Sequence, residues 1–229
     1  MVASTPERRQ LLRRSTLFSR LPDEEIDALL AHAVIERFRA GALIGAKGDP
    51  GSSMMAVLTG QVVISVLSLE GKQVVLNIIN EGEVVGEIAL LDGKERSADM
   101  TASTNCELLV IERRSFLPLL ERPALTRELL RVLCEKVRRA SEQVEDVLFL
   151  DVEARIAKAL LRLAQNRPAP SRPGGGVVLR ISQRELGNLV GASRESVNKQ
   201  LQAWRRSGIV AIDNGAIVIR NAAALEEFG

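Results

Sequence analysis

The chain has 229 residues, of which 46% are hydrophobic and 26% charged, and its net charge is +2. This composition is typical of one or two folded domains and excludes an intrinsically disordered chain. The lone histidine, His32, excludes a multi-histidine metal site and leaves a nucleophile–histidine pair only one residue to use, so we expect no enzyme.

The apolar stretches, the first 14 residues and the two cysteines all favour a cytoplasmic location. No stretch approaches the roughly 20 consecutive apolar residues that a membrane-spanning helix needs. Residues 1–14 lack the apolar core of a signal peptide. Cys106 and Cys134 lie in differently patterned segments, and we expect two reduced structural thiols. The sequence therefore predicts a cytoplasmic protein that makes no membrane contact.

The first half of the chain predicts a short helix followed by a β-rich block. An acidic turn at 22–25 precedes apolar residues at helical spacing. From Gly41 to about Glu112, short runs rich in Val and Ile alternate with glycine-containing turns, as in a β-sandwich or barrel. The expected strands are 54–58, 61–67, 73–79 and 107–111.

Residues 124–150 predict a long helix with a narrow apolar seam. Apolar or small residues recur there at alternating steps of three and four, namely Leu130, Leu133, Val137, Ala140, Val144 and Val147. Such a heptad seam favours a parallel partner helix, most simply from a second copy of the chain. The alternative is a helix that packs on its own domain. We predict a homodimer.

Two short helices around a glycine follow in the last third. Ser182 and Glu185 have the spacing of a capping box, and the helix that they begin is expected to end near Gly191. Ser193 is placed to cap a second helix that runs to about Arg206. This pair is the core of a helix-turn-helix.

The segments around this pair complete a winged helix-turn-helix. Residues 152–165 predict a helix, and the Pro- and Gly-rich stretch 166–176 predicts a loop. Asn214-Gly215 separates two apolar runs and is a strong signal for a two-residue β-hairpin. A hairpin after two such helices is the wing.

The second helix carries side chains suited to reading DNA. Arg194 and Glu195 lie on its first turn and Lys199 one turn later, where a recognition helix meets base edges. Arg can donate two hydrogen bonds to guanine, and Glu can accept one from cytosine. The alternative is a solvated, salt-bridged helix face, and Trp204 is expected in the core. The predicted DNA contacts are Ser182, Gln183, Ser193, Arg194, Glu195 and Lys199.

A second constellation lies at residues 82–98, inside the β-rich block. A short helix that opens around Gly86 would present backbone N–H groups to an anion. Arg96 would add a bidentate partner for a phosphate and Ser97 a hydroxyl. Glu87 is an acceptor for a ribose hydroxyl. The pattern predicts a site for a phosphate-containing ligand.

From about Phe18 to Phe228 the chain resembles the family that includes the cyclic AMP receptor protein and the fumarate and nitrate reduction regulator. The resemblance is carried by Gly86-Glu87-Ile88-Ala89 with Arg96-Ser97-Ala98, by Phe149-Leu150-Asp151-Val152 before Arg155-Ile156-Ala157, and by Val190-Gly191-Ala192-Ser193-Arg194-Glu195-Ser196-Val197. It implies an α+β chain with three parts. These are a cyclic-nucleotide-binding β-roll with flanking helices (1–123), a dimerisation helix (124–150) and a winged helix-turn-helix (151–229).

The resemblance also implies roles for individual residues. The cyclic phosphate would lie on Arg96 and Ser97, and the ribose 2′-hydroxyl on Glu87. Arg194 would read the first guanine–cytosine pair of a TGTGA-like half-site. The predicted nucleotide-binding residues are Gly86, Glu87, Ile88, Ala89, Arg96, Ser97 and Ser141.

One departure from the family pattern concerns the base of the nucleotide. Members that bind cyclic AMP usually carry adjacent Thr and Ser on the dimerisation helix, where both touch the adenine amine. Here the pair is Ala140-Ser141, so one hydroxyl is missing. Ala140 lies on the heptad seam, where a small side chain also permits tighter helix packing. Cyclic AMP is the predicted ligand, and cyclic GMP is the alternative.

We therefore predict a homodimeric transcription regulator that a cyclic nucleotide switches into a form that binds palindromic promoter DNA, with RNA polymerase as a further partner. A regulator that binds DNA without a nucleotide is the first alternative. A cyclic-nucleotide-binding subunit that acts through protein contacts is the second, and Arg194 and Glu195 argue against it. We expect no metal, haem or iron–sulfur cluster: two cysteines cannot supply four ligands, and His32, placed in a helix before the β-roll, is expected to be structural.

Overall fold

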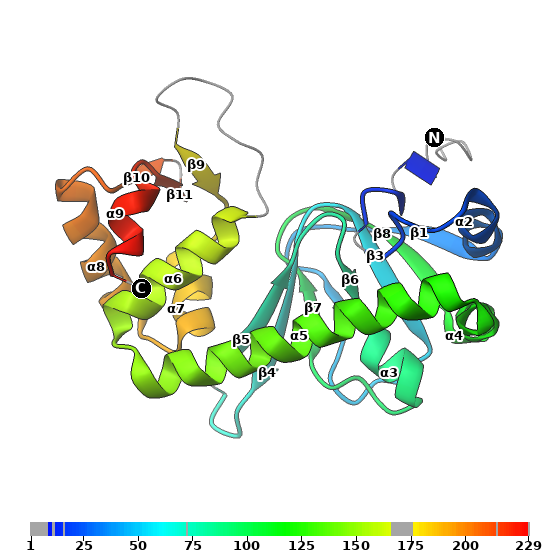
Figure 1. Ribbon diagram of the computed structural model, residues 1–229. Coiled ribbons are helices and arrows are strands. Elements are labelled where there is room, and N and C mark those ends of the chain that lie inside the picture. The colour runs from blue at the N-terminus through cyan, green and yellow to red at the C-terminus, as the bar shows by residue number, and fades with distance from the viewer. Residues whose placement is uncertain are drawn as a thin grey trace. The chain divides into compact units, whose positions relative to one another are not determined.

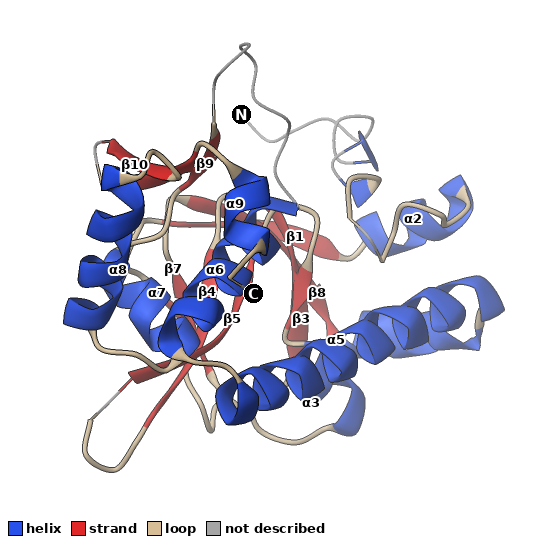
Figure 2. Ribbon diagram, turned by 60° about the vertical axis from the view of Figure 1, so that its left-hand side comes forward, coloured by secondary structure: helices blue, strands red, loops and turns tan. Residues whose placement is uncertain are grey.

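The structure is a computed structural model that describes residues 9–10, 12–15, 17–71, 73–165, 176–213 and 215–228. The chain divides into two compact units, residues 1–138 and 139–229, and the division falls inside helix α5 (Pro123–Phe149). Both units contain helices and strands, as expected of an α+β chain (Figure 2). Within the described ranges, no helix is long and apolar enough to cross a membrane.

Two four-stranded antiparallel sheets form the β-rich block of the first unit (Figure 1). One has the strand order β1-β8-β3-β6 and the other the order β2-β7-β4-β5. Their strands are β1 (Ala33–Phe38), β2 (Leu43–Gly45), β3 (Ser53–Thr59), β4 (Val62–Leu67), β5 (Gln73–Ile79), β6 (Val84–Val85), β7 (Asp99–Ala102) and β8 (Cys106–Glu112). The helices of this unit include α2 (Asp23–Leu30), α3 (Glu87–Asp92), α4 (Arg113–Phe116) and the 3-10 helix η1 (Leu117–Glu121).

Strand β3 is buried on both faces and so joins two cores. Met55 and Val57 belong to a cluster that also takes in residues of β4 and β7 from the other sheet. Met54 and Ala56 point the other way, into a cluster that includes residues of α2 and α5. Because successive side chains alternate between faces, a strand covered on both sides becomes a continuous apolar run.

All four predicted strands of the block are confirmed, but two predictions about its start are wrong. The strands begin at Ala33 rather than Gly41. In β1 the apolar residues Ala33 to Ile35 are followed by the charged pair Glu36-Arg37, so the sequence shows neither alternation nor a long apolar run. His32 lies in the turn between α2 and β1, exposed and outside the helix in which it was predicted.

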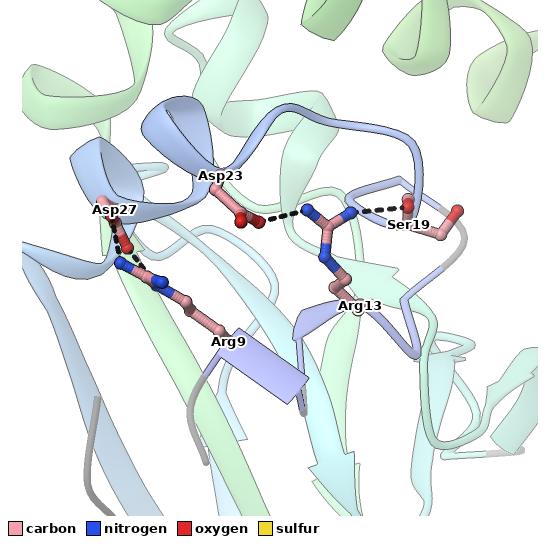
Figure 3. Close-up of polar contacts among 5 residues, drawn as sticks. All are labelled: Arg9, Arg13, Ser19, Asp23 and Asp27. Carbon is pink, nitrogen blue, oxygen red and sulfur yellow. Dashed lines mark hydrogen bonds and ion pairs between the residues drawn. The ribbon is translucent and has the colours of Figure 1, made fainter. Parts of the chain in front are cut away.

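The start of the described chain is held against α2 by ion pairs (Figure 3). Arg9 donates to both carboxylate oxygens of Asp27, and its Nε lies 2.5 Å from Oδ1. Arg13 pairs with Asp23 and donates to the carbonyl oxygen of Ser19 at 3.1 Å. The hydrogen bond from Arg13, and then its positive charge, lowers the pKa of Asp23. These contacts neutralise part of the acidic first turn of α2.

Helix α5 confirms the predicted long helix and presents two faces with different surroundings. In the first unit, Leu125, Leu129 and Val132 are buried in the core between the helices and a sheet. The heptad seam lies on another face, where only Leu133 is half-buried against that core. Four seam residues are largely exposed: Leu130 at 57%, Val137 at 67%, Val144 at 60% and Val147 at 58%. The face that packs on its own unit is therefore not the seam.

The second unit contains three short strands and four helices besides the end of α5, within its described residues. They are α6 (Val152–Gln165), β9 (Val177–Leu179), α7 (Gln183–Val190), α8 (Arg194–Arg206), β10 (Val210–Asp213), β11 (Ala216–Ile219) and α9 (Ala222–Glu226). The strands form an antiparallel sheet in the order β10-β11-β9. The predicted helix 152–165 is confirmed at both ends.

The helix starts of the second unit follow the predicted caps. Ser182 Oγ accepts a hydrogen bond from the backbone N–H of Glu185 at 3.1 Å, and the Glu185 carboxylate accepts one from Ser182 N–H at 2.8 Å. The capping box is therefore confirmed. Ser193 caps α8 by accepting from the N–H of Ser196 at 3.0 Å.

The wing is confirmed as a hairpin. Asp213 pairs with Ala216, which leaves two residues for the turn, and Gly215 has a φ of +81°. Asn214 lies outside the described residues, as does the predicted loop 166–176 except for Gly176. Strand β9 was not predicted, because a three-residue strand is too short to show a period.

Candidate functional site

Helix α3 begins at the glycine that the sequence singles out. Gly86 has a φ of +81°, which favours glycine, and a Cβ built on it would lie 2.3 Å from Nη1 of Arg96. Both the backbone conformation and the close approach of Arg96 therefore require glycine here. The predicted short helix is confirmed and brings residues 86 and 96 together.

Arg96 is buried, with 7% of its surface exposed, and its guanidinium is bound inside the first unit. Nη1 donates to the carbonyl oxygen of Gly86 at 2.9 Å and Nη2 to Ser53 Oγ at 3.1 Å. Burial lowers the pKa of Arg96, and the charges of Asp49 and Glu87 oppose that shift. Each terminal nitrogen carries two hydrogens, so each can donate to a phosphate oxygen and keep its present bond.

Glu87 is buried, with 2% of its surface exposed, and is paired with a lysine from α5. Lys136 Nζ lies 2.7 Å from Glu87 Oε1 and also donates to the carbonyl oxygen of Val84 at 2.9 Å. The pair neutralises a carboxylate that burial would otherwise penalise. A carboxylate has two oxygens with about four lone-pair sites, so Glu87 can accept a ribose hydroxyl and keep Lys136.

Gly86, Glu87, Ile88, Ala89, Arg96 and Ser97 together form what we call the cassette, and its remaining residues differ in exposure. Ala89 is buried, and its Cβ would lie 2.4 Å from a Cβ built on Gly51, so both positions need small residues. Ile88 is 52% exposed and Ser97 is exposed. Ser141 is exposed on the part of α5 that belongs to the second unit, and its contact with the base stays a prediction.

Helix α8 separates a buried face from a charged one. Val197, Leu201 and Trp204 are buried, and the Trp204 ring lies 5.5 Å from that of Phe228, so its predicted core position is confirmed. Arg194, Glu195 and Lys199 are all exposed. The arrangement leaves the first turns of α8 accessible to base edges.

Three further residues of the predicted DNA set lie at helix starts. Ser182 and Ser193 are exposed and use their hydroxyl oxygens as caps, and Gln183 is half-buried at the start of α7. A hydroxyl that accepts a hydrogen bond as a cap, such as that of Ser182, can still donate its own hydrogen to a phosphate oxygen, whereas the Ser193 hydroxyl also lies 2.9 Å from that of Ser196. Their contact with DNA stays a prediction.

Lys136 and Ser53 contact the cassette residues Glu87 and Arg96, and neither contact was predicted. They lie 49 residues from Glu87 and 43 residues from Arg96. Lys136 directly precedes the seam residue Val137, and the heptad pattern favours an ion pair with the partner helix for a lysine at this position rather than one with Glu87. No local signal in the sequence pairs either residue with its partner.

The described residues contain no group of three or more His, Cys, Asp or Glu side chains placed to hold a metal ion. Cys106 is buried, Cys134 is exposed, and both are free thiols.

Two protein families match the chain, one in each half. Residues 35–123 match the cyclic nucleotide-binding domain, and residues 154–228 match the Crp-like helix-turn-helix domain. The first match contains the cassette, and the second contains the recognition helix α8.

Characterised relatives cover almost the whole chain. It is 34% identical over 217 residues to the cyclic AMP receptor protein of Thermus thermophilus, which covers 94% of this chain and 97% of the relative. It is 30% identical over 219 residues to the CRP-like cAMP-activated global transcriptional regulator of Mycobacterium tuberculosis, with the same coverage. The second name denotes a transcriptional regulator, and the two domain matches together with these relatives place the chain among regulators rather than enzymes.

Solved structures of similar proteins agree with these domain matches and relatives. A transcriptional regulator of the CRP/FNR family from Thermus thermophilus gives a TM-score of 0.71 at 28% identity, over 85% of this chain and 97% of that one. The c-di-GMP responsive global regulator CLP of Xanthomonas campestris gives a TM-score of 0.72 at 28% identity, over 86% and 99%.

Proposed function

Because this chain belongs to the CRP/FNR family of cyclic-nucleotide-binding transcription regulators, we propose that cyclic AMP binds at the α3 cassette of a homodimer and switches it into the form that binds promoter DNA. The observation that carries the proposal is the Arg96 guanidinium, buried beside the N-terminus of α3 and within the matched nucleotide-binding domain. A cyclic phosphate is an anion of the size and charge that such a guanidinium binds.

The nucleotide would use the cassette as follows. Its phosphate accepts hydrogen bonds from Arg96 and Ser97, and its ribose hydroxyl donates to the carboxylate of Glu87, which is paired with Lys136. The first-turn N–H groups at Ile88 and Ala89 face the same anion. Ser141 contacts the base from α5.

A dimer is supported by the exposed seam of α5. An apolar row from Leu130 to Val147 in water is unfavourable, and a parallel copy of α5 would bury it at the spacing of a coiled coil. The same two-fold symmetry would present two α8 helices to two half-sites about 34 Å apart on the duplex.

Two other cyclic nucleotides are alternative ligands for this site. Cyclic GMP is favoured by the missing hydroxyl at Ala140, and cyclic di-GMP by the name of the regulator from Xanthomonas campestris. Cyclic AMP is placed first because the names of both curated relatives quoted above specify it.

Calorimetric titration of the full chain with each of the three nucleotides tests the proposal. The titrations are done with and without a symmetric duplex that carries TGTGA-like half-sites. We expect cyclic AMP to bind, and the duplex to tighten its binding by about 5- to 150-fold, since linkage is reciprocal. Binding of cyclic AMP without any mutual effect would favour the nucleotide-independent regulator.

The variant Arg96→Leu tests the pocket assignment. Loss of a charge-assisted contact is expected to weaken nucleotide binding by about 10- to 100-fold. Its melting temperature is the control, because Arg96 also bonds to Gly86 and Ser53. A folded Arg96→Leu protein with unchanged nucleotide affinity would falsify the assignment.

A further inference from the structure

Helix α6 is joined to α5 by a short connection that is held by hydrogen bonds. Only Leu150 and Asp151 separate the two helices. The N–H of Leu150 donates to the carbonyl oxygen of Asp146 at 3.1 Å, and the Asp151 carboxylate caps α6 by accepting from Ala154 N–H at 2.9 Å. Hydrogen bonds to α5 and to α6 therefore hold the two-residue connection Leu150-Asp151, which we call the joint.

An ion pair crosses this joint. The carboxylate of Asp146, on the last turn of α5, lies 2.6 Å from Nζ of Lys158 on α6, and the Asp146 side chain is only 15% exposed. Arg162, one turn further along α6, is affected by the same carboxylate: burial lowers the pKa of Arg162, and the charge of Asp146 opposes that shift. Asp146 therefore forms an ion pair with Lys158, and its charge also acts on Arg162.

Near the same end, α6 also contacts α8. Glu153 lies on the first turn of α6, and its Oε1 accepts a hydrogen bond from the side-chain amide of Gln200 at 2.5 Å. Gln200 is half-buried on α8 and directly follows the exposed Lys199. All of these residues belong to the second unit.

We propose that Asp146–Lys158 and Glu153–Gln200 make α6 a coupling element, which sets the orientation of α8 according to that of the end of α5. The four side chains are positioning residues and do not touch DNA or nucleotide. Their geometry supports this role, because the first half of α6 makes one charged contact with the last turn of α5 and another with the middle of α8. The inference rests on the proposed function, since it concerns how a nucleotide signal reaches α8.

The test measures the operator affinity of the full-length chain by fluorescence anisotropy, without cyclic AMP and at saturating cyclic AMP. The activation ratio is the operator affinity at saturating cyclic AMP divided by the affinity without it. This ratio is compared among Lys158→Gln, Glu153→Ala and Gln200→Ala. Each is expected to lower the ratio by about 2- to 5-fold, the range for a partly exposed charged contact. The double variant Glu153→Ala/Gln200→Ala should lose no more than either single variant, because the two residues form one contact.

Two controls separate positioning from stability. Lys158→Arg keeps the charge and should keep the ratio. Arg37→Gln removes an ion pair of similar length, 2.6 Å to Glu107, in the β-rich block of the first unit, and should leave the ratio unchanged. Cyclic AMP affinity without DNA should be the same in every variant.

Two results would overturn the inference, and they differ. If the unaltered chain gives a ratio of one, the proposed function fails and the inference fails with it. In the second case the unaltered chain is activated, but Lys158→Gln and Glu153→Ala have the same ratio as it does. Their operator affinities with and without cyclic AMP are then either unchanged or weakened by the same factor, and the contacts are merely structural.

Discussion

The two candidate sites hold their charged groups in opposite ways. In the cassette, Glu87 and Arg96 are buried and bound by groups of the same unit, Lys136 and Ser53 among them. On α8, Arg194, Glu195 and Lys199 are exposed, and the helix is held by its cap and its apolar face.

The difference follows from the size of what each site would bind. A small anion can be enclosed, so its partners are fixed in advance in a water-poor environment, where each charged contact is stronger. A duplex approaches from outside, so the reading side chains stay hydrated until it arrives and contribute through position and count. Substitutions in the cassette should therefore lower the stability of the first unit, whereas substitutions of the exposed side chains of α8 should lower the affinity for DNA.

The largest effect is expected where both sites depend on one feature, the seam of α5. Val137→Glu would bury like charges across a two-fold axis, each without a partner, at a cost of about 3–5 kcal/mol. Sedimentation should show monomers, and binding to palindromic DNA should be lost. Arg138→Glu, at the neighbouring outward position, is the control and should stay dimeric. A Val137→Glu dimer that still binds operator would mean that the seam packs elsewhere.

The next prediction tests the claim that the cassette is stabilised by internal pairing. Lys136→Gln leaves the Glu87 carboxylate buried without its cation and should lower the free energy of unfolding by about 3 kcal/mol. Lys199→Gln on α8 should change it by less than about 0.5 kcal/mol. Chemical denaturation of nucleotide-free protein measures both. Equal effects of the two lysine substitutions would remove the distinction between the sites.

The same distinction explains which features could be predicted from the sequence. The second unit is organised by local signals: Ser182 and Glu185 lie three residues apart, and the sequence Asn214-Gly215 is a short-range signal for a two-residue hairpin. The strands around Met54 and the heptad spacing of α5 are also local patterns. Each of these elements could therefore be located without knowledge of the tertiary structure.

What was missed depends on long-range contacts or on weak local patterns. The Glu87–Lys136 and Arg96–Ser53 contacts join residues more than 40 positions apart, and opposite charge alone does not select a partner. Strand β1 was missed because its apolar residues do not alternate with polar ones, and His32 was therefore placed in a helix that ends two residues earlier.

Arg194→Ala should affect operator binding without affecting the first unit. Loss of a bidentate contact to guanine is expected to weaken operator binding by about 1–3 kcal/mol and to relax discrimination at that base pair. Competition between operators that differ only at this pair measures the discrimination. Nucleotide affinity without DNA should be unaltered. If Arg194→Ala keeps full discrimination, the base is read by another side chain.

The smallest effect concerns Ser182, which is a cap in the structure and a predicted DNA contact. Ser182→Ala removes the acceptor for Glu185 N–H and should lower the free energy of unfolding by about 1 kcal/mol. Ser182→Asp retains a capping acceptor, and its negative charge interacts favourably with the positive end of the helix dipole, so the stability should be unchanged. The carboxylate would, however, repel a nearby phosphate, so operator affinity should fall in Ser182→Asp. Because added salt screens that repulsion, its affinity should decline less steeply with salt than that of the alanine variant. Denaturation and anisotropy on the same two proteins separate the roles. If Ser182→Asp binds operator as tightly as the unaltered chain, the residue is a cap alone and the first turn of α7 lies away from the duplex.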